Sequence, residues 1–265
     1  MKNYFKKSFN YRAIIWILSF LVVIQAIFIV LLLRSRPKKI PPRGVAFKGK
    51  IAIVIDDFGY NLHNLALLEE INYPLNVSIL PNLSYSETLA KEFHRRGYEI
   101  ILHLPLEPEE KFRLENNTIL TSMDEETIRD ILSQDLASVR YPRGVSNHMG
   151  SKATQDLKTV QIIFAALKNK RLYFLDSLVS PKSICRALAK KMKVAFAQRD
   201  IFLDNQPDTR YIKQQINKLR LEAWINGQAI GIGHDRKLTL EVLREAIPEL
   251  EKEGYRLVFL SELVR

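Results

Sequence analysis

The chain is poor in residues that several common kinds of site require. Its one cysteine, Cys185, excludes an internal disulfide and a cysteine-rich zinc site. The G-x-S-x-G pattern that carries the nucleophile of α/β-hydrolases is absent. A phosphate-binding loop is excluded as well, because Gly231 and Gly233 lack a third glycine and Leu238 follows Lys237 where serine or threonine is needed.

Acidic residues are missing from the first fifty positions, which hold eleven lysines and arginines. The whole chain has a formal net charge of +11, but residues 51–265 carry 29 basic and 29 acidic side chains. A neutral globular part lacks the basic surface that phosphate binding needs. We therefore expect no nucleic-acid partner.

One long apolar run occurs, at Ala13–Leu33, and only Ser19 and Gln25 interrupt it. As a helix it would be about 30 Å long, enough to cross the core of a bilayer. Arg34 follows directly without a small-residue cleavage site, which favours an uncleaved anchor over a signal peptide. The predicted organisation is a basic tail (1–12), a transmembrane anchor (13–33), a basic linker with prolines (34–49) and one folded domain (50–265).

Short apolar segments alternate with helical stretches along the folded domain. This alternation predicts a parallel sheet, either an open doubly wound sheet or a closed or incomplete barrel. Polar side chains follow many different predicted strands, which favours the mouth of a barrel over the single switch point of an open sheet. The expected strands are Ile51–Ile55, Leu75–Leu80, Glu99–Leu102, Gly144–Ser146, Leu172–Leu175, either Val194–Ala197 or Ile201–Leu203, Ala229–Ile232 and Leu257–Leu260.

Two adjacent carboxylates, Asp56 and Asp57, close the first predicted strand. Carboxylates side by side repel, so the pair is costly unless a cation or a proton is shared between them. A helix cap or a solvated turn is the alternative interpretation. The strand-end position favours chemistry, because parallel sheets carry their sites at the carboxyl ends of strands.

Three histidines stand at comparable strand ends. His103 begins the segment HLPLEP, whose two prolines exclude a regular helix and predict a stiff loop that directs His103 and Glu107 toward one point. His148 is placed to be a metal ligand, and His234 to be a proton donor or acceptor. Each alone could equally be a structural histidine, but together they predict a metal site or an acid–base pair.

Taken in order, the segments IAIVIDDFGY, HLPLEP, GVSNHMGS, the Asp176-Ser177 strand end, RDIFLDN and AIGIGHD resemble the divergent branch of the polysaccharide deacetylases. The resemblance covers nearly all of residues 50–265. It implies a distorted or incomplete (β/α) barrel of about seven parallel strands and a divalent metal ion, which in this family is usually zinc. It also implies that Asp56 is the general base and that Asp57 binds the metal.

The family has a second metal-binding histidine four residues after the first, and this chain has Glu107 at that position. The resemblance therefore implies Asp57, His103 and one further ligand, either Glu107 or His148. We choose His148, because two imidazoles and one carboxylate preserve the ligand set of the family.

The resemblance implies roles for the remaining strand-end residues too. His234 would protonate the departing amine, and Asp200 or Arg199 would orient the general base. A further set of polar side chains is expected to contact the substrate: Asn147, Asp176, Asp204 and Asn205.

The implied activity is the metal-assisted removal of acetyl groups from an envelope carbohydrate such as peptidoglycan. Basic residues flank the apolar run on both sides, so the positive-inside rule does not fix its orientation. The resemblance favours a single-pass protein of the cytoplasmic membrane with its barrel on the outer side. Two alternatives stay open: an inactive barrel that binds glycan or assists envelope assembly, and a hydrolase of another ester, which the lack of a basic surplus disfavours if that ester is a phosphoester.

Overall fold

The computed structural model describes residues 46–265 and a few earlier ones (16, 21–22 and 24–25). The predicted tail, anchor and linker lie almost entirely outside these residues. Within the part that is described, no helix combines the length and the apolar character needed to cross a bilayer. Residues 46–265 belong to one compact unit.

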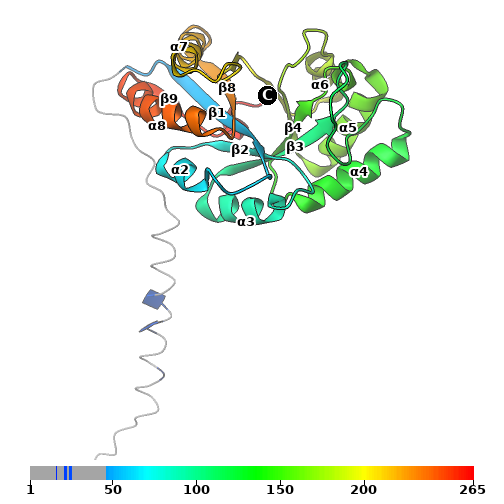
Figure 1. The fold of residues 1–265 in the computed structure, drawn as a ribbon, viewed down its shortest axis with the longest axis horizontal. Helices are drawn as coiled ribbons and strands as arrows, with labels where there is room; N and C mark the ends of the chain where they lie inside the picture. The colour runs from blue at the N-terminus through cyan, green and yellow to red at the C-terminus, as the bar shows by residue number, and fades with distance from the viewer. Residues whose placement is uncertain (1–15, 17–20, 23, 26–45) are drawn as a thin grey trace, which may run out of the picture. The chain divides into compact units, whose positions relative to one another are not determined.

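A curled sheet of nine parallel strands forms the centre of this unit (Figure 1). The strand order is β6-β5-β4-β3-β2-β1-β8-β7, and β9 pairs with β1 beside this path. The strands are β1 (Gly49–Phe58), β2 (Asn76–Ile79), β3 (Glu99–Leu106), β4 (Gly144–Met149), β5 (Tyr173–Asp176), β6 (Phe196–Gln198), β7 (Ile201–Phe202), β8 (Gln228–His234) and β9 (Tyr255–Leu257).

Helices connect the strands and cover the outer face of the sheet (Figure 1). Two short 3-10 turns complete the fold, one before α5 and one near the C-terminus. The elements are α2 (Leu65–Glu70), α3 (Ser86–Arg96), α4 (Glu125–Ser138), η1 (Ala153–Gln155), α5 (Leu157–Lys170), α6 (Cys185–Met192), α7 (Thr209–Asn226), α8 (Lys237–Lys252) and η2 (Leu260–Glu262).

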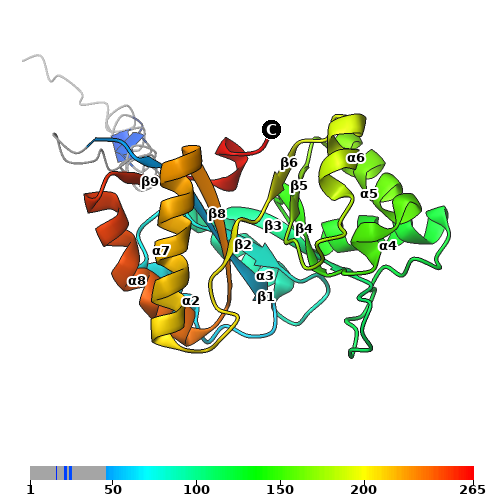
Figure 2. The same ribbon diagram turned by 90° about the horizontal axis from the view of Figure 1, so that it is seen from above.

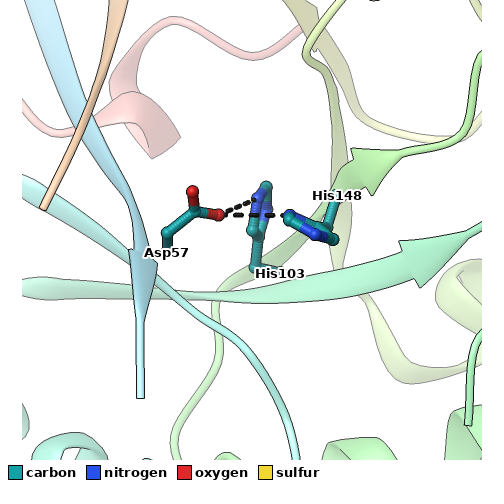
Figure 3. Close-up of side chains that lie close together, drawn as sticks. All are labelled: Asp57, His103 and His148. Carbon is teal, nitrogen blue, oxygen red and sulfur yellow. Dashed lines mark hydrogen bonds and ion pairs between the residues drawn. The ribbon is translucent and has the colours of Figure 1, made fainter. Parts of the chain in front are cut away.

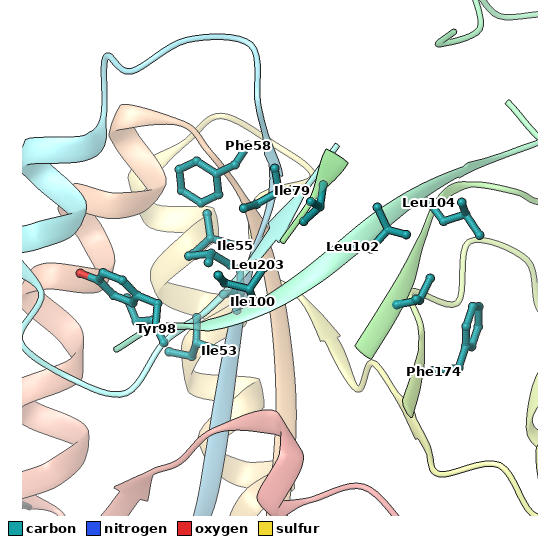
Figure 4. Close-up of a cluster of buried hydrophobic side chains, with 14 of the residues drawn as sticks. Ile53, Ile55, Phe58, Ile79, Tyr98, Ile100, Leu102, Leu104, Phe174 and Leu203 are labelled. Carbon is teal, nitrogen blue, oxygen red and sulfur yellow. The ribbon is translucent and has the colours of Figure 1, made fainter. Parts of the chain in front are cut away.

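Successive residues of β1 alternate between two apolar clusters. Ile51, Ile53 and Ile55 belong to the cluster between the sheet and the helices, part of which is drawn in Figure 4. Ala52 and Val54 belong to a second cluster on the concave face of the sheet. Because both faces are buried, the strand is an unbroken apolar run rather than an alternation of polar and apolar residues.

The sheet is an incomplete barrel. Its edge strands β6 and β7 are separated by only two residues, Arg199 and Asp200, and the backbone there links the two edges. The Arg199 N–H donates to the Asp176 carbonyl at the end of β5 (3.0 Å), and the Asp200 N–H donates to the Ile230 carbonyl of β8 (2.9 Å). The expected distorted or incomplete barrel is therefore present, with nine strands rather than about seven, because both alternative segments, 194–197 and 201–203, contribute a short strand and the sheet includes β9.

The C-terminal segment fills the concave face near the amino ends of the strands. Leu260 of η2 lies in the inner apolar cluster, and Figure 2 shows this segment between β8 and β6. The Leu260 N–H donates to the Asn76 side chain (2.8 Å) and the Ser261 N–H to the Glu99 carboxylate (2.9 Å), at the starts of β2 and β3. The prediction of a strand over Leu257–Leu260 is thus wrong beyond residue 257, since the chain turns to close the end opposite to the predicted site.

Candidate metal centre

Three side chains from three neighbouring regions of the sheet meet at the carboxyl ends of β1, β3 and β4. The Asp57 Oδ1 atom lies 3.3 Å from His103 Nε2 and 3.1 Å from His148 Nδ1. All three ligand atoms are within 4.8 Å of one another, and Figure 3 shows them pointing toward a common centre. No second group of this kind occurs among residues 46–265 and the few others described.

Local backbone geometry brings these side chains together. Asp57 has a φ of 68°, a strained value for a non-glycine residue, and it lies where the register of β1 against β2 shifts, between Ile55 and Phe58. Such strain persists where the surrounding structure supports it, often at functional sites. The shift takes Asp57 out of the regular strand alternation.

His103 and His148 lie within strands rather than in loops. Strand β3 continues through Pro105 to Leu106, and Pro105 is in register with His148 of β4. The stiff loop expected from His103 onward is therefore wrong, although a regular helix is indeed absent from this segment. Ladder positions two residues apart, His103 with Ser146 and Pro105 with His148, therefore fix the direction of both imidazoles.

The alternative ligand Glu107 is directed elsewhere. Its carboxylate accepts hydrogen bonds from the Thr121 N–H and hydroxyl, both at 2.7 Å, and from Lys152 Nζ at 2.7 Å. Burial tends to raise the pKa of Glu107, but these donors hold it below its usual value. Glu107 therefore secures the segment after β3, while His148 stands beside Asp57.

Charge in the centre favours a bound cation. Burial alone would raise the pKa of Asp57, but hydrogen bonds from His103 and His148 hold it well below its usual range. Asp56 is 2 % exposed, and its Oδ1 atom has no hydrogen-bond partner. Burial raises the pKa of Asp56, against the attraction of His103. Two adjacent carboxylates, of which Asp56 is almost fully buried, are stable only with positive charge nearby.

The donor set fits a divalent metal such as zinc. Zinc binds carboxylate oxygen and imidazole nitrogen at about 2.0–2.2 Å, which places tetrahedral ligand atoms about 3.3–3.5 Å apart. The two contacts of Asp57 Oδ1, 3.3 Å and 3.1 Å, are close to that spacing. Three protein ligands would leave a coordination position open. The residues that we predicted as ligands are thus the ones that the fold brings together.

His234 completes the site from β8. It stands in register with Asp56 on the adjacent strand, and its Nε2 atom is 3.9 Å from Asp57 Oδ2. Its Nδ1 atom donates to Asp204 Oδ1 at 2.8 Å, and the ring stacks on Phe202. Burial would lower the pKa of His234, but the hydrogen bond to Asp204 outweighs it and raises this pKa.

The structure corrects the expected role of Asp204. This residue is fully buried, and its other carboxylate oxygen accepts from the His234 N–H (2.9 Å) and the Thr239 hydroxyl (2.7 Å). A carboxylate so occupied is not available to a substrate. Asp204 instead fixes the orientation of His234 and holds its Nδ1 proton.

Arg199 and Asp200 hydrogen-bond other groups than the general base. The Arg199 guanidinium donates to the carbonyls of Ser177 (2.7 Å) and Leu178 (2.9 Å) and lies over the Phe202 ring. The Asp200 carboxylate accepts from the Ile230 N–H at 2.7 Å. Both side chains therefore secure the junction between the two edges of the sheet, and a role of either in orienting Asp56 stays a prediction.

Two of the remaining expected substrate contacts have structural roles as well. Asn147, which is 1 % exposed, donates to the Met149 carbonyl and accepts from the Ser177 N–H, each at 2.8 Å. Asp176 is also 1 % exposed and accepts from the Leu178 N–H and the Ser183 hydroxyl. They shape the segment after β5, whereas Asn205 is exposed and its contact with substrate stays a prediction.

Sequence reasoning missed two serines beneath the centre. Ser146 Oγ is 2.7 Å from His103 Nδ1 and 2.7 Å from Ser78 Oγ, and both serines are fully buried. A hydroxyl within an otherwise apolar buried strand was the available signal, because such a group needs a partner.

Comparison with known proteins agrees with this geometry. The profile of the divergent polysaccharide deacetylases matches residues 53–264. The uncharacterized protein YibQ of Escherichia coli K12 is 36% identical over 202 residues, which cover 76% of this chain and 63% of YibQ, less than two thirds of that protein's length.

Solved structures show the same fold at lower identity. A crystal structure of an uncharacterized protein from Agrobacterium tumefaciens C58 superposes with a TM-score of 0.79 at 22% identity, covering 84% of this chain and 92% of that one. The catalytic domain of a peptidoglycan N-acetylglucosamine deacetylase from Eubacterium rectale superposes with a TM-score of 0.52 at 14% identity, covering 85% and 93%. The extent of the profile match shows that the chain belongs to the divergent polysaccharide deacetylase family.

Proposed function

We propose that the protein is a metal-dependent hydrolase that removes acetyl groups from an envelope glycan. The observation that carries this proposal is the convergence of Asp57, His103 and His148, with ligand atoms within 4.8 Å of one another, beside the buried carboxyl of Asp56. A protein that only binds glycan has no need of such a set. Family membership supports the reaction class.

Asp57 Oδ1, His103 Nε2 and His148 Nδ1 would hold the metal. When bound, a divalent ion supplies Lewis-acid chemistry: it lowers the pKa of water and polarises a carbonyl oxygen. Asp56, beside this centre and without a partner on Oδ1, accepts the proton of the attacking water. A bond forms between the water oxygen and the acetyl carbon, and the carbon–nitrogen bond breaks.

His234 donates the proton that the departing amine requires. It faces the centre through Nε2, while Asp204 holds Nδ1. Because Asp204 accepts the Nδ1 proton, the imidazolium form of His234 carries its second proton on Nε2, the nitrogen that faces the centre, and the hydrogen bond to Asp204 favours this form by raising the pKa of His234. Acid and base therefore stand on adjacent strands, in register at Asp56 and His234.

An acetylated amino sugar of the envelope is the substrate class that we favour. The similar fold of a peptidoglycan N-acetylglucosamine deacetylase supports this choice. We also propose that Ala13–Leu33 anchors the chain in the cytoplasmic membrane with the barrel on the outer side, next to that glycan. Protease digestion of intact and of permeabilised cells tests the orientation.

The test of the proposal combines metal analysis with acetate release. We expect one zinc or other divalent ion per chain in the wild type, and loss of it in His103→Ala and His148→Ala. His94→Ala, which removes a histidine of α3 that stacks on Tyr141, is the matched control and retains the metal. Asp56→Asn and His234→Gln keep the metal but release acetate from N-acetylated glycan about 10²–10⁴-fold more slowly.

The outcomes separate the alternatives. A wild type that stays metal-free when offered zinc, nickel or cobalt contradicts the proposal and leaves a glycan-binding role. A loaded protein that retains glycan without releasing acetate contradicts the hydrolase in the same way. Release of phosphate rather than acetate from suitable esters would reassign the substrate.

A further inference from the structure

We infer that the buried pair Ser78 and Ser146 positions the metal centre by holding Nδ1 of His103, so that Nε2 is the nitrogen that faces the centre. The inference rests on the proposed function, because it concerns how the residues of the same site are arranged to receive a metal. Neither serine belongs to the ligand set or to the acid–base pair.

A continuous row of buried polar groups runs under the centre. His103 Nδ1 lies 2.7 Å from Ser146 Oγ, and Ser146 Oγ lies 2.7 Å from Ser78 Oγ. His103 is 3 % exposed and both serines are 0 % exposed, so water does not compete for these hydrogen bonds.

Each hydroxyl in the row has one proton, so the row has a direction. If Ser146 donates to Ser78, it can only accept from His103. The Nδ1 atom of His103 then carries the proton, and the lone pair of Nε2 points toward Asp57. In the opposite direction Ser146 donates to Nδ1, and Nε2 carries a proton where a metal would bind.

A metal needs the lone pair of the nitrogen that faces it, so the direction in which Ser146 accepts the Nδ1 proton is the one that serves a metal site. The serine pair therefore supports the form of His103 that can serve as a ligand. Outer partners of metal-binding histidines commonly contribute 10–100-fold in metal affinity.

The test measures zinc affinity by competition with a chelator in the full-length protein and its Ser146→Ala and Ser78→Ala variants. Ser86→Ala is the matched control, because Ser86 is a buried, hydrogen-bonded serine outside the site. We expect Ser146→Ala to lose 10–100-fold in zinc affinity, Ser78→Ala to lose at least several-fold, and Ser86→Ala to be unchanged.

A second readout follows the proton itself. With histidines labelled with ¹⁵N, the five histidine side chains can be assigned, and His103 in the zinc-loaded wild type should carry a slowly exchanging proton on Nδ1. In Ser146→Ala that proton loses its acceptor and exchanges faster, while Ser146→Thr, which keeps a hydroxyl, restores protection.

Two results would overturn the inference. One is a zinc affinity of Ser146→Ala equal to that of Ser86→Ala, and the other is a proton on Nε2 of His103 in the loaded wild type. Either can occur in a protein that binds zinc and releases acetate, in which case the proposed function stands. A wild type that does not bind zinc would contradict both the proposed function and this inference.

Discussion

At the scale of single residues, Glu107 shows how this chain differs from the wider deacetylase pattern. It stands where a second histidine is expected, and its carboxylate instead binds Thr121 and Lys152. The place beside Asp57 is taken by His148 from the adjacent strand. Under the proposed function, His148 has the metal-binding role and Glu107 holds a loop.

Replacing Glu107 by glutamine should therefore leave metal content unchanged and loosen the loop. The amide keeps one acceptor for Thr121 but loses the charge that attracts Lys152, so we expect a cost of about 1 kcal/mol in unfolding free energy. Metal analysis and urea unfolding of Glu107→Gln measure the two effects. A loss of metal comparable to that in His148→Ala would show that Glu107 is a ligand after all.

Asp135 of α4 gives the fold a pH dependence of its own. It is fully buried, its Oδ1 atom accepts from Asn82 at 2.6 Å, and its Oδ2 atom has no partner. Burial raises its pKa to about 7, and the hydrogen bond from Asn82 only partly opposes this. The folded protein therefore favours the protonated carboxyl.

The sign of the resulting effect follows from proton linkage. The folded state holds more protons than the unfolded state between the unfolded pKa near 4 and the folded value about 7, so unfolding free energy falls as pH rises through this range. Asp135→Asn should remove this loss and be on the order of 2–4 kcal/mol more stable than the wild type at pH 8. Urea unfolding at pH 5, 6, 7 and 8 measures it, and parallel curves for the two proteins would contradict the assignment.

At the scale of elements, the junction between β6 and β7 connects the two edges of the incomplete barrel. The Arg199 guanidinium satisfies two loop carbonyls and stacks on Phe202, which in turn packs on His234. The junction thus joins the loop after β5 to the strand region that supports the acid.

We expect Arg199→Ala to destabilise the protein by about 2–3 kcal/mol, because it leaves the carbonyls of Ser177 and Leu178 without their donor. Arg199→Lys should recover little of this stability, since lysine cannot donate to two carbonyls in the planar geometry of a guanidinium. Thermal unfolding and zinc content of Arg199→Ala and Arg199→Lys provide the measurement. Loss of zinc without loss of stability would instead place Arg199 in the site.

The strands themselves were largely predictable, and their ends were not. Apolar runs bounded by polar residues locate β1, β3 and β4 well, since burial on both faces leaves that pattern. The ladder nevertheless continues past the apolar residues to His103 and His148, because backbone pairing does not depend on the polarity of the side chain. Reading a polar residue as the end of a strand therefore placed both histidines in loops.

The grouping of the site residues was predictable where their chemistry is distinctive. A carboxylate and two imidazoles that follow three predicted strands point to a metal, and the structure brings them together. The hydrogen-bond partners of Asp204 and Arg199 were not predictable, because a strand-end carboxylate or guanidinium serves equally to contact a substrate and to support a neighbour. Only the partners seen in the fold distinguish these uses.

At the scale of the whole molecule, the C-terminal turn is part of the core. The apolar stretch at its end suggests a strand, but periodicity does not separate a short strand from a buried turn. Leu260 and Leu263 fill the concave face among residues of several strands. The incomplete barrel is stabilised from within by this last segment.

Leu260→Ala should accordingly destabilise the protein by about 2–5 kcal/mol, as expected for a fully buried leucine. Leu221→Ala is the matched control, because Leu221 is 50% exposed and its loss should change stability by less than about 0.5 kcal/mol. Urea unfolding of both variants tests this. Equal effects of the two substitutions would show that the C-terminal turn does not belong to the core.

The pairing of β1 with β8 and β9 also has a kinetic consequence. Lys50 pairs with Gln228, and Gly49 with Tyr255, so the first strand of the sheet finds two of its partners near the far end of the chain. Contacts of such high sequence separation require the closure of long loops and slow folding. Asp56 and His234 can therefore come into register only after nearly all of the polypeptide has been synthesised, and assembly of the acid–base pair should be among the last events of folding.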